Sequence, residues 1–177
     1  VSGSNLGLNV GDDIAYSGTV SAAFDAALNG LPAVAVSQQS VAQEMGYPRD
    51  ATYDFTGMAR VLPGIVARVL EFRDELPEGL VVNVNVPGCP AHELRGIEFG
   101  VPGRRIYRDK LVLQGDEDGR RTYQLYGDDP EHHAHETDTD IAAIGRGNVA
   151  ISTLRFNAAD TETALAMATW NLGALLG

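Results

Sequence analysis

The chain has 177 residues, of which 44% are hydrophobic, and this is enough for one domain with a real core. Its 24 acidic and 13 basic residues give a formal net charge of -11, which argues against long nucleic acid as a partner. The single cysteine, Cys89, excludes an intrachain disulfide and a multi-thiolate metal site, and is compatible with a cytoplasmic location. No apolar run is long enough to span a membrane, so we expect no membrane association.

The first 37 residues combine a polar, glycine-rich loop with a helix and a strand. We expect the helix to be capped by Ser17 or Thr19 and to end at Gly30. Residues 33–36, after Pro32, predict a buried strand. The helical stripe consists of Val20, Ala23, Phe24, Ala27 and Leu28.

The loop before this helix is rich in side-chain oxygens and contains no sulfur. Such a set suits Mg²⁺, Mn²⁺ or Ca²⁺ better than zinc. Because the helix begins directly after the loop, its unpaired N–H groups and positive dipole end favour a bound phosphate. The oxygen-bearing residues are Ser2, Asn5, Asn9, Asp12, Asp13, Ser17 and Thr19.

Residues 53–76 keep a helical stripe in which Pro63 should cause a kink or mark the first turn. Residues 80–86 read as another strand. The order strand, loop, helix, strand predicts an α/β sheet with its site at the carboxyl ends of the strands.

Residues 95–99 and 104–113 read as strands, and a turn at residues 115–119 leads into a strand at 120–126. The result is a long hairpin. Because a hairpin alone is marginally stable in water, we expect a partner subunit to cover its apolar side chains.

The rest of the chain reads as an acidic loop over residues 127–139, a last strand over 148–154 and a closing helix over 160–176. Asp160 is the expected cap of that helix.

One ordered set of residues near the start of the chain consists of Ser2, Gly3, Asn5, Gly7, Asn9, Gly11, Asp13, Ile14, Tyr16, Ser17, Gly18, Thr19 and Val20. This set resembles the SurE (stationary-phase survival protein) family of nucleotidases. Looser matches to the family continue through Gly30-Leu31-Pro32-Ala33, Asn83-Val84-Asn85-Val86-Pro87, Gly103-Arg104-Arg105 and Thr139-Asp140.

The resemblance implies a Rossmann-like three-layer α/β sheet with a protruding β-hairpin and a C-terminal helix. It implies a single, incomplete domain, with core parts at residues 1–94 and 145–159, a hairpin extension at 95–130 and a helix at 160–177. It also implies a homodimer or homotetramer in which subunits exchange the hairpin and the C-terminal region.

The activity implied is metal-dependent hydrolysis of nucleoside 5′-monophosphates, and of 3′-monophosphates as a further possibility. Asn5 matches a ligand of the divalent metal, Mg²⁺ or Mn²⁺. Asn9, Ser17 and Thr19 match catalytic positions around the phosphate, and Gly18 lets the backbone approach it. In the family, a pair of aspartates and a serine lie upstream of the segment that begins here, so we expect residues 1–177 alone to be inactive.

The chain departs from the family pattern at Ser4 and, near the C-terminus, at Ala150, Ser152 and Thr153. These departures concern local packing more than the site.

Several alternatives stay open. Ser17 and Thr19 could be helix caps only, and the chain could be a non-catalytic oligomerising or nucleotide-sensing module. A serine hydrolase is disfavoured because Ser17 lacks a G-x-S-x-G elbow. Asp12 and Asp13 read more readily as loop carboxylates than as a metal pair.

Three further groups have weaker functional readings. The cluster of His132, His133 and His135 reads as exposed more readily than as a metal site. Arg104 and Arg105 could contact an anionic substrate, although a solvated hairpin face is favoured. A nucleophilic role for Cys89 is disfavoured.

Overall fold

The computed structural model describes residues 1–43, 51–104, 110–126, 137–157 and 160–176. Five of the strands form one sheet in the order β1-β2-β3-β7-β4. The first three are parallel, β7 runs antiparallel to β3, and β4 is parallel to β7. The strands are β1 (Ser2–Leu6), β2 (Ala33–Gln38), β3 (Leu80–Val86), β4 (Ile97–Phe99) and β7 (Val149–Arg155).

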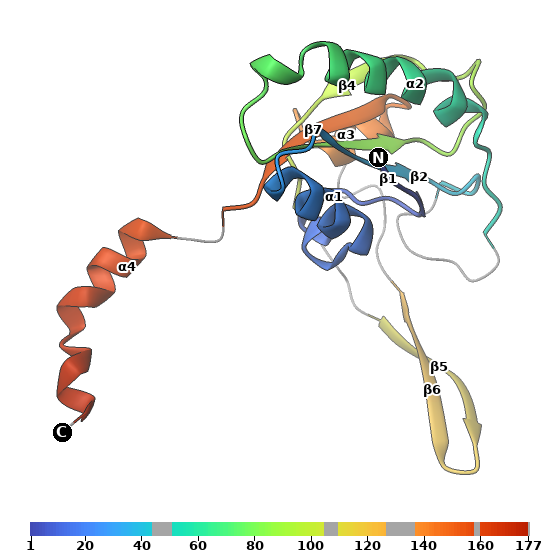
Figure 1. The fold of residues 1–177 in the computed structure, drawn as a ribbon. Helices are drawn as coiled ribbons and strands as arrows, with labels where there is room; N and C mark the ends of the chain where they lie inside the picture. The colour runs from blue at the N-terminus through green and yellow to red at the C-terminus, as the bar shows by residue number, and fades with distance from the viewer. Residues whose placement is uncertain (44–50, 105–109, 127–136, 158–159, 177) are drawn as a thin grey trace.

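Helices cover both faces of this sheet (Figure 1). Helix α2 (Thr56–Glu71) lies on one face, and α1 (Gly18–Leu28) and α3 (Asp140–Gly145) lie on the other. The predicted three-layer α/β fold is therefore confirmed. Pro63 lies inside α2 and does not mark its first turn, and α2 is shorter than the predicted segment of residues 53–76.

Alternating side chains of the central strands supply two cores, as the period of two in a strand requires. Val34, Val36, Val82 and Val84 pack with Met58 of α2 on one face. On the other face, α1 contributes a second core consisting of Val20, Ala23 and Ala27 with Ala33, Ala35, Val81 and Leu154. Farther along that face, Ser37, Asn83 and Asn85 are buried where apolar residues would be expected, and this marks the region of the site.

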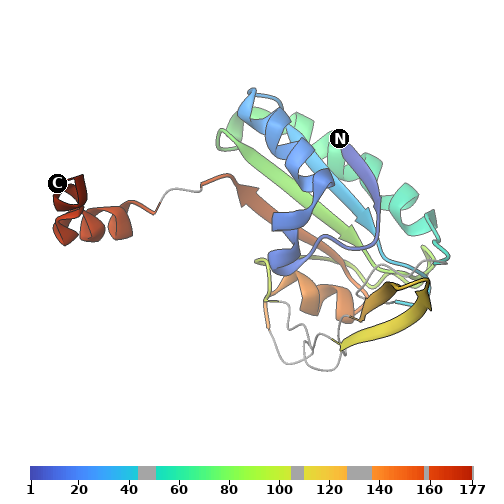
Figure 2. The same ribbon diagram turned by 90° about the horizontal axis from the view of Figure 1, so that it is seen from below.

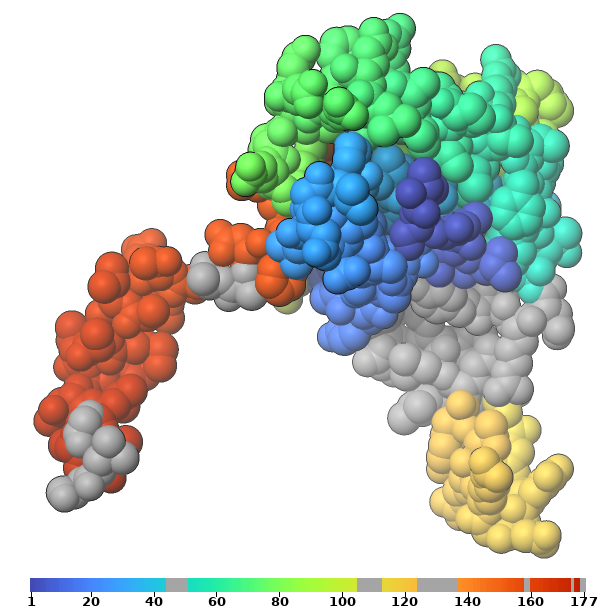
Figure 3. All heavy atoms as spheres, viewed as in Figure 1, coloured from blue at the N-terminus to red at the C-terminus, as the bar shows by residue number. Residues whose placement is uncertain are grey.

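The expected hairpin is present as β5 (Lys110–Glu117) and β6 (Arg120–Tyr126), and it extends away from the sheet (Figures 1 and 3). The turn is tighter than expected, because β5 continues to Glu117 and the turn residues Asp118 and Gly119 both have positive φ. Residues 95–99 were expected to belong to this extension. Instead, β4 is an edge strand of the large sheet.

Four elements differ from the expectations. Helix α3 lies between the expected acidic loop and the expected last strand, where no element was expected. The segments η1 (Gly11–Tyr16) and η2 (Arg73–Glu75) are short 3₁₀ turns. The expected single helix over 160–176 is wrong. It divides into α4 (Thr161–Met167), η4 (Ala168–Trp170) and η5 (Leu172–Leu176), and Asn171, between η4 and η5, adopts the left-handed conformation.

The C-terminal segment stands away from the sheet (Figure 2). Its large apolar side chains are exposed, with Leu165 at 68% and Trp170 at 62%. Asp160 caps α4 as expected, since its carboxylate accepts a hydrogen bond from the backbone N–H of Thr163 at 2.9 Å. No helix among the described residues is long and apolar enough to cross a membrane.

Candidate phosphate and metal site

The polar loop lies where the three parallel strands end. The register places Asn5 of β1 beside Ser37 of β2, and Ser37 beside Asn85 of β3. The carboxyl ends of β1, β2 and β3 therefore bring polar residues to one edge of the sheet, as expected for an α/β site.

Asn9 is a buried residue of the loop, with 1% of its surface exposed. Its backbone N–H donates to Asn85 Oδ1 at 2.8 Å, and its carbonyl accepts from Asn85 Nδ2 at 3.0 Å and from Asn83 Nδ2 at 2.9 Å. Its own amide nitrogen donates to Ser37 Oγ at 2.8 Å. The strand amides thus fix the backbone of the loop, and the predicted contact of Asn9 with phosphate stays a prediction.

Asn5 lies at the carboxyl end of β1 and is partly exposed. Its Nδ2 donates to the carbonyl of Gly7 at 2.9 Å, so its Oδ1 is directed away from that carbonyl, and the hydroxyl of Thr19 donates to Oδ1 at 3.2 Å. The predicted metal ligand and a predicted phosphate residue are therefore in direct contact.

The first turn of α1 is open at its N-terminus. Ser17 is the N-cap, and its Oγ accepts a hydrogen bond from the N–H of Val20 at 3.1 Å. Gly18 is exposed, and a Cβ built on it would have no neighbour within 4 Å. Because the first N–H groups of an α-helix lack intrahelical partners, this end presents donors to an approaching anion.

The two loop carboxylates differ in exposure. Asp13 is 7% exposed, whereas Asp12 is exposed to solvent. Within the described part of the chain, no group of three or more His, Cys, Asp or Glu residues could hold a metal ion. This finding gives no support to Asp12 and Asp13 as the centre of a metal site.

A buried carboxylate that the sequence reading left without a role, Asp140, lies next to the loop. It accepts hydrogen bonds from the N–H groups of Gly11 and Gly103, each at 2.9 Å, and of Ile141 at 2.8 Å. Burial raises the pKa of Asp140, and the N–H groups of Gly103 and Gly11 oppose that rise.

Asn83, Asn85 and Asp140 match the family pattern, but the sequence alone indicates no function for them. The available signal was the alternation in Leu80–Val86, which places asparagines on the same face of a buried strand. A buried asparagine needs hydrogen-bond partners, and here the partner is the backbone of a loop.

The remaining candidates lie elsewhere or outside the described residues. The histidine cluster and Arg105 are outside them, and Arg104 is exposed. Cys89 is buried, and burial raises the pKa of its thiol, which disfavours the reactive thiolate.

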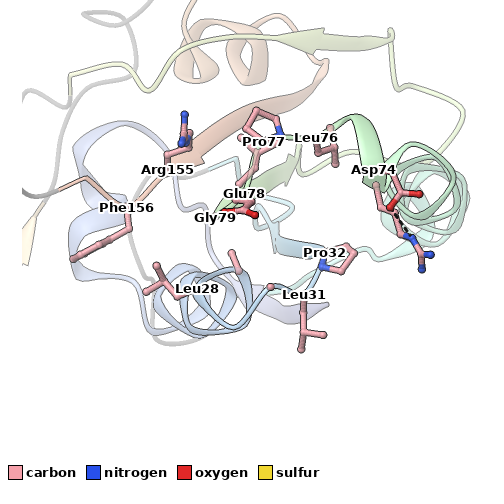
Figure 4. A pocket seen from close by; sticks show the side chains of 14 residues that line it. Leu28, Leu31, Pro32, Asp74, Leu76, Pro77, Glu78, Gly79, Arg155 and Phe156 are labelled. Atoms are coloured by element: carbon pink, nitrogen blue, oxygen red, sulfur yellow. Dashed lines mark ion pairs between the residues drawn. The ribbon is translucent and has the colours of Figure 1, made fainter.

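A cavity of about 840 Å³ lies at the opposite end of the strands (Figure 4). Leu28, at the last turn of α1, and Pro32, before β2, line it together with Arg155 and Phe156. It is therefore separate from the polar loop, which follows the carboxyl ends of the strands.

Comparison with known proteins identifies the family. The model of the family described as survival protein SurE matches residues 1–109. The 5′-nucleotidase SurE of Rubrobacter xylanophilus is 35% identical over 99% of this chain and 65% of its own length, and that of Chloroflexus aggregans is 40% identical over 89% and 58%. The crystal structure of the SurE protein from Aquifex aeolicus has a TM-score of 0.74 and 30% identity, covering 95% of this chain and 63% of that one.

This chain spans about 65% of the length of the first of these relatives. The match to the Rubrobacter xylanophilus relative covers 99% of this chain, and the solved structure shares the fold. The chain belongs to the SurE family.

Proposed function

We propose that this chain forms the phosphate-binding part of a metal-dependent phosphomonoesterase that hydrolyses nucleoside 5′-monophosphates. The observation that carries the proposal is the contact between Thr19 and Asn5, because it joins an open helix N-terminus to a side-chain oxygen suited to a hard cation. The relatives named 5′-nucleotidase SurE supply the reaction class.

The substrate phosphate would lie at the first turn of α1. The N–H groups of Gly18 and Thr19 belong to the first turn and would donate to it. Toward the N–H of Val20 the Oγ of Ser17 is an acceptor, so its own proton could be donated to the phosphate. These donors stabilise the negative charge of the phosphoryl group in the transition state.

The side chain of Asn5 fits a Mg²⁺ or Mn²⁺ ion, for which it would be one ligand of a larger set. Asn5 Oδ1 is a neutral, hard oxygen at the edge of the sheet, whereas such an ion usually takes at least one carboxylate. When bound, the ion supplies Lewis acidity toward the phosphoryl oxygens and toward water. The hydroxyl of Thr19 orients the Asn5 oxygen, and the hydrogen bond from Asn5 Nδ2 to the carbonyl of Gly7 fixes the rotamer of the amide.

The test is phosphate release from a panel of nucleoside monophosphates by the intact protein, with Mn²⁺ or Mg²⁺ and with a chelator. Thr19→Val keeps the shape of the side chain but removes its hydroxyl, so we expect turnover to fall on the order of 10-fold or more, while Thr163→Val in the exposed α4 leaves it unchanged. Absence of metal-dependent phosphate release would overturn the proposal and favour the oligomerising or nucleotide-sensing module.

A further inference from the structure

Asp140 is the first residue of α3, and its side chain is fully buried. Its two oxygens serve different segments of the chain. Oδ2 accepts from the N–H of Gly11, and Oδ1 accepts from the N–H of Gly103, with both distances at 2.9 Å. One carboxylate therefore joins two backbone segments that are distant in sequence.

The two segments have different destinations. Gly11 begins η1, which leads to Ser17 and the first turn of α1. Gly103 lies on the path from β4 to the hairpin strand β5. The position of Gly11 therefore affects the candidate phosphate site. Gly103 lies in residues 100–104, the described segment before the hairpin, which we call the hairpin base.

The backbones also touch directly. A Cβ on Gly11 would lie 2.5 Å from the carbonyl oxygen of Gly103, and Gly11 has φ of +58°. Both the close approach and the left-handed conformation require glycine at this position.

All the groups that contact the carboxylate are donors. The N–H of Ile141 donates to Oδ1 at 2.8 Å, and the hydroxyl of Ser152, on β7, lies 3.5 Å from Oδ2. None of the ion pairs found among the described residues includes Asp140. Backbone dipoles therefore balance its charge. The N–H groups that supply these dipoles need a hydrogen-bond acceptor at this position.

We propose that Asp140 is a positioning residue, which holds the loop at Gly11 against the hairpin base at Gly103 and thereby fixes the first turn of α1 for phosphate. The proposal rests on the phosphatase function proposed above. Asn in place of Asp would turn an NH₂ group toward at least one of the backbone donors, so the shared contact could not form in full.

The test compares Asp140→Asn with Thr139→Val in the intact protein. Thr139 Oγ1 accepts from the N–H of Ala142 at 3.2 Å, so its variant removes the cap of α3 without changing the Asp140 carboxylate. Hydrogen exchange is measured by mass spectrometry for peptides containing Gly11 or Gly103, with a β3 peptide as reference. Hydrolysis of a nucleoside monophosphate is measured in parallel, at a temperature at which both variants are folded.

We expect exchange in the Gly11 and Gly103 peptides to be at least about 10-fold faster in Asp140→Asn, as loss of a charge-assisted hydrogen bond implies. We also expect kcat to fall at least about 10-fold, because small displacements of catalytic donors are costly, whereas Thr139→Val keeps kcat within about 3-fold. If Asp140→Asn does not fold, Asp140→Glu, which keeps the charge but displaces it, is used with the same expectations.

Unchanged hydrogen exchange at both Gly11 and Gly103 would overturn the proposal that Asp140 holds the two segments together. Faster exchange with unchanged kcat would overturn the positioning role. If the unmodified protein releases no phosphate at all, the proposed function fails. In that case the exchange data alone decide whether Asp140 joins the loop to the hairpin base.

Discussion

Asn85 pairs with the backbone of Asn9 as a neighbouring strand would, because its side-chain amide both accepts from the Asn9 N–H at 2.8 Å and donates to the Asn9 carbonyl at 3.0 Å. Asn83 makes only the second kind of contact, at 2.9 Å. The loop after β1 is therefore held by side chains of β3, and the two asparagines contribute unequally.

This inequality predicts the stability of two matched variants. Asn85→Leu leaves the buried N–H of Asn9 without its acceptor, so we expect the free energy of unfolding to fall by about 2 to 3 kcal/mol. Asn83→Leu should cost less, because the Asn9 carbonyl keeps Asn85 and because Asn83 Oδ1 is already buried without a partner. Urea unfolding of both variants measures the difference, and a larger loss for Asn83→Leu would contradict this reading.

The sequence predicted the layers of the fold because periodicity reports which side chains face a core. The stripe of α1 and the strand Leu80–Val86 could be read in this way. The cap of α1 was narrowed only to Ser17 or Thr19, and the structure shows Ser17. The break at Asn171 could not, since the choice between a continuous helix and a left-handed residue depends on backbone conformation and not on hydrophobic pattern.

The candidate site was predictable where one short segment carries it. Asn5, Ser17 and Thr19 belong to a single loop and helix start, and the structure brings Asn5 and Thr19 into contact. Asp140 was not predictable, because its partners Gly11 and Gly103 are backbone groups from distant segments. Sequence spacing does not reveal hydrogen bonds to a backbone that lies far away along the chain.

Asp140 also predicts a dependence of stability on pH. Burial raises the pKa of its carboxyl above the ordinary value of 3.8 by more than the backbone donors lower it, so the folded chain loses this proton at a higher pH than the unfolded chain does. The stability that this group contributes is therefore fully present below pH 3.8 and is lost as the pH rises through the raised pKa.

The measurement is the free energy of unfolding of the unmodified protein and of Asp140→Asn, at a series of pH values from 3.8 upward. We expect the advantage of the unmodified protein over the variant to shrink with increasing pH across this window. An advantage that grows with pH would show that the backbone donors outweigh burial, and that the pKa is lowered.

The contact between Asn5 and Thr19 predicts the effect of a metal-site variant. Asn5→Ala in the intact protein should weaken Mn²⁺ binding on the order of 10-fold or more, whereas Asn5→Asp should retain or strengthen it, because a carboxylate is a better ligand for a hard cation. Isothermal titration measures both. Tight Mn²⁺ binding that survives Asn5→Ala would assign the metal to other residues.

The exposed apolar side chains of the C-terminal segment predict an assembly. Leu165 and Trp170 are more than half exposed, and Leu175 is 81% exposed, so burial against a second copy would remove apolar surface from water. We expect sedimentation at micromolar concentration to show a homodimer or homotetramer, and replacement of residues 110–126 by a short turn to reduce the oligomeric state. A monomeric unmodified protein would contradict the expected assembly, and an unchanged state in the shortened variant would exclude the hairpin from it.

The proposal that the first turn of α1 binds the phosphate of a substrate is tested most directly at Ser17, by kcat/KM for a nucleoside monophosphate in the intact protein. Ser17→Ala removes both the cap and the hydroxyl, whereas Ser17→Asp keeps a cap acceptor for the Val20 N–H but places negative charge beside the bound phosphate. Ser17→Thr keeps the cap and the hydroxyl and serves as the matched control. We predict that Ala and Asp both lower kcat/KM on the order of 10²-fold, while Asp and Thr keep thermal stability near that of the unmodified protein. Hydrolysis by Ser17→Asp at the unmodified rate would contradict the account and leave Ser17 as a helix cap only.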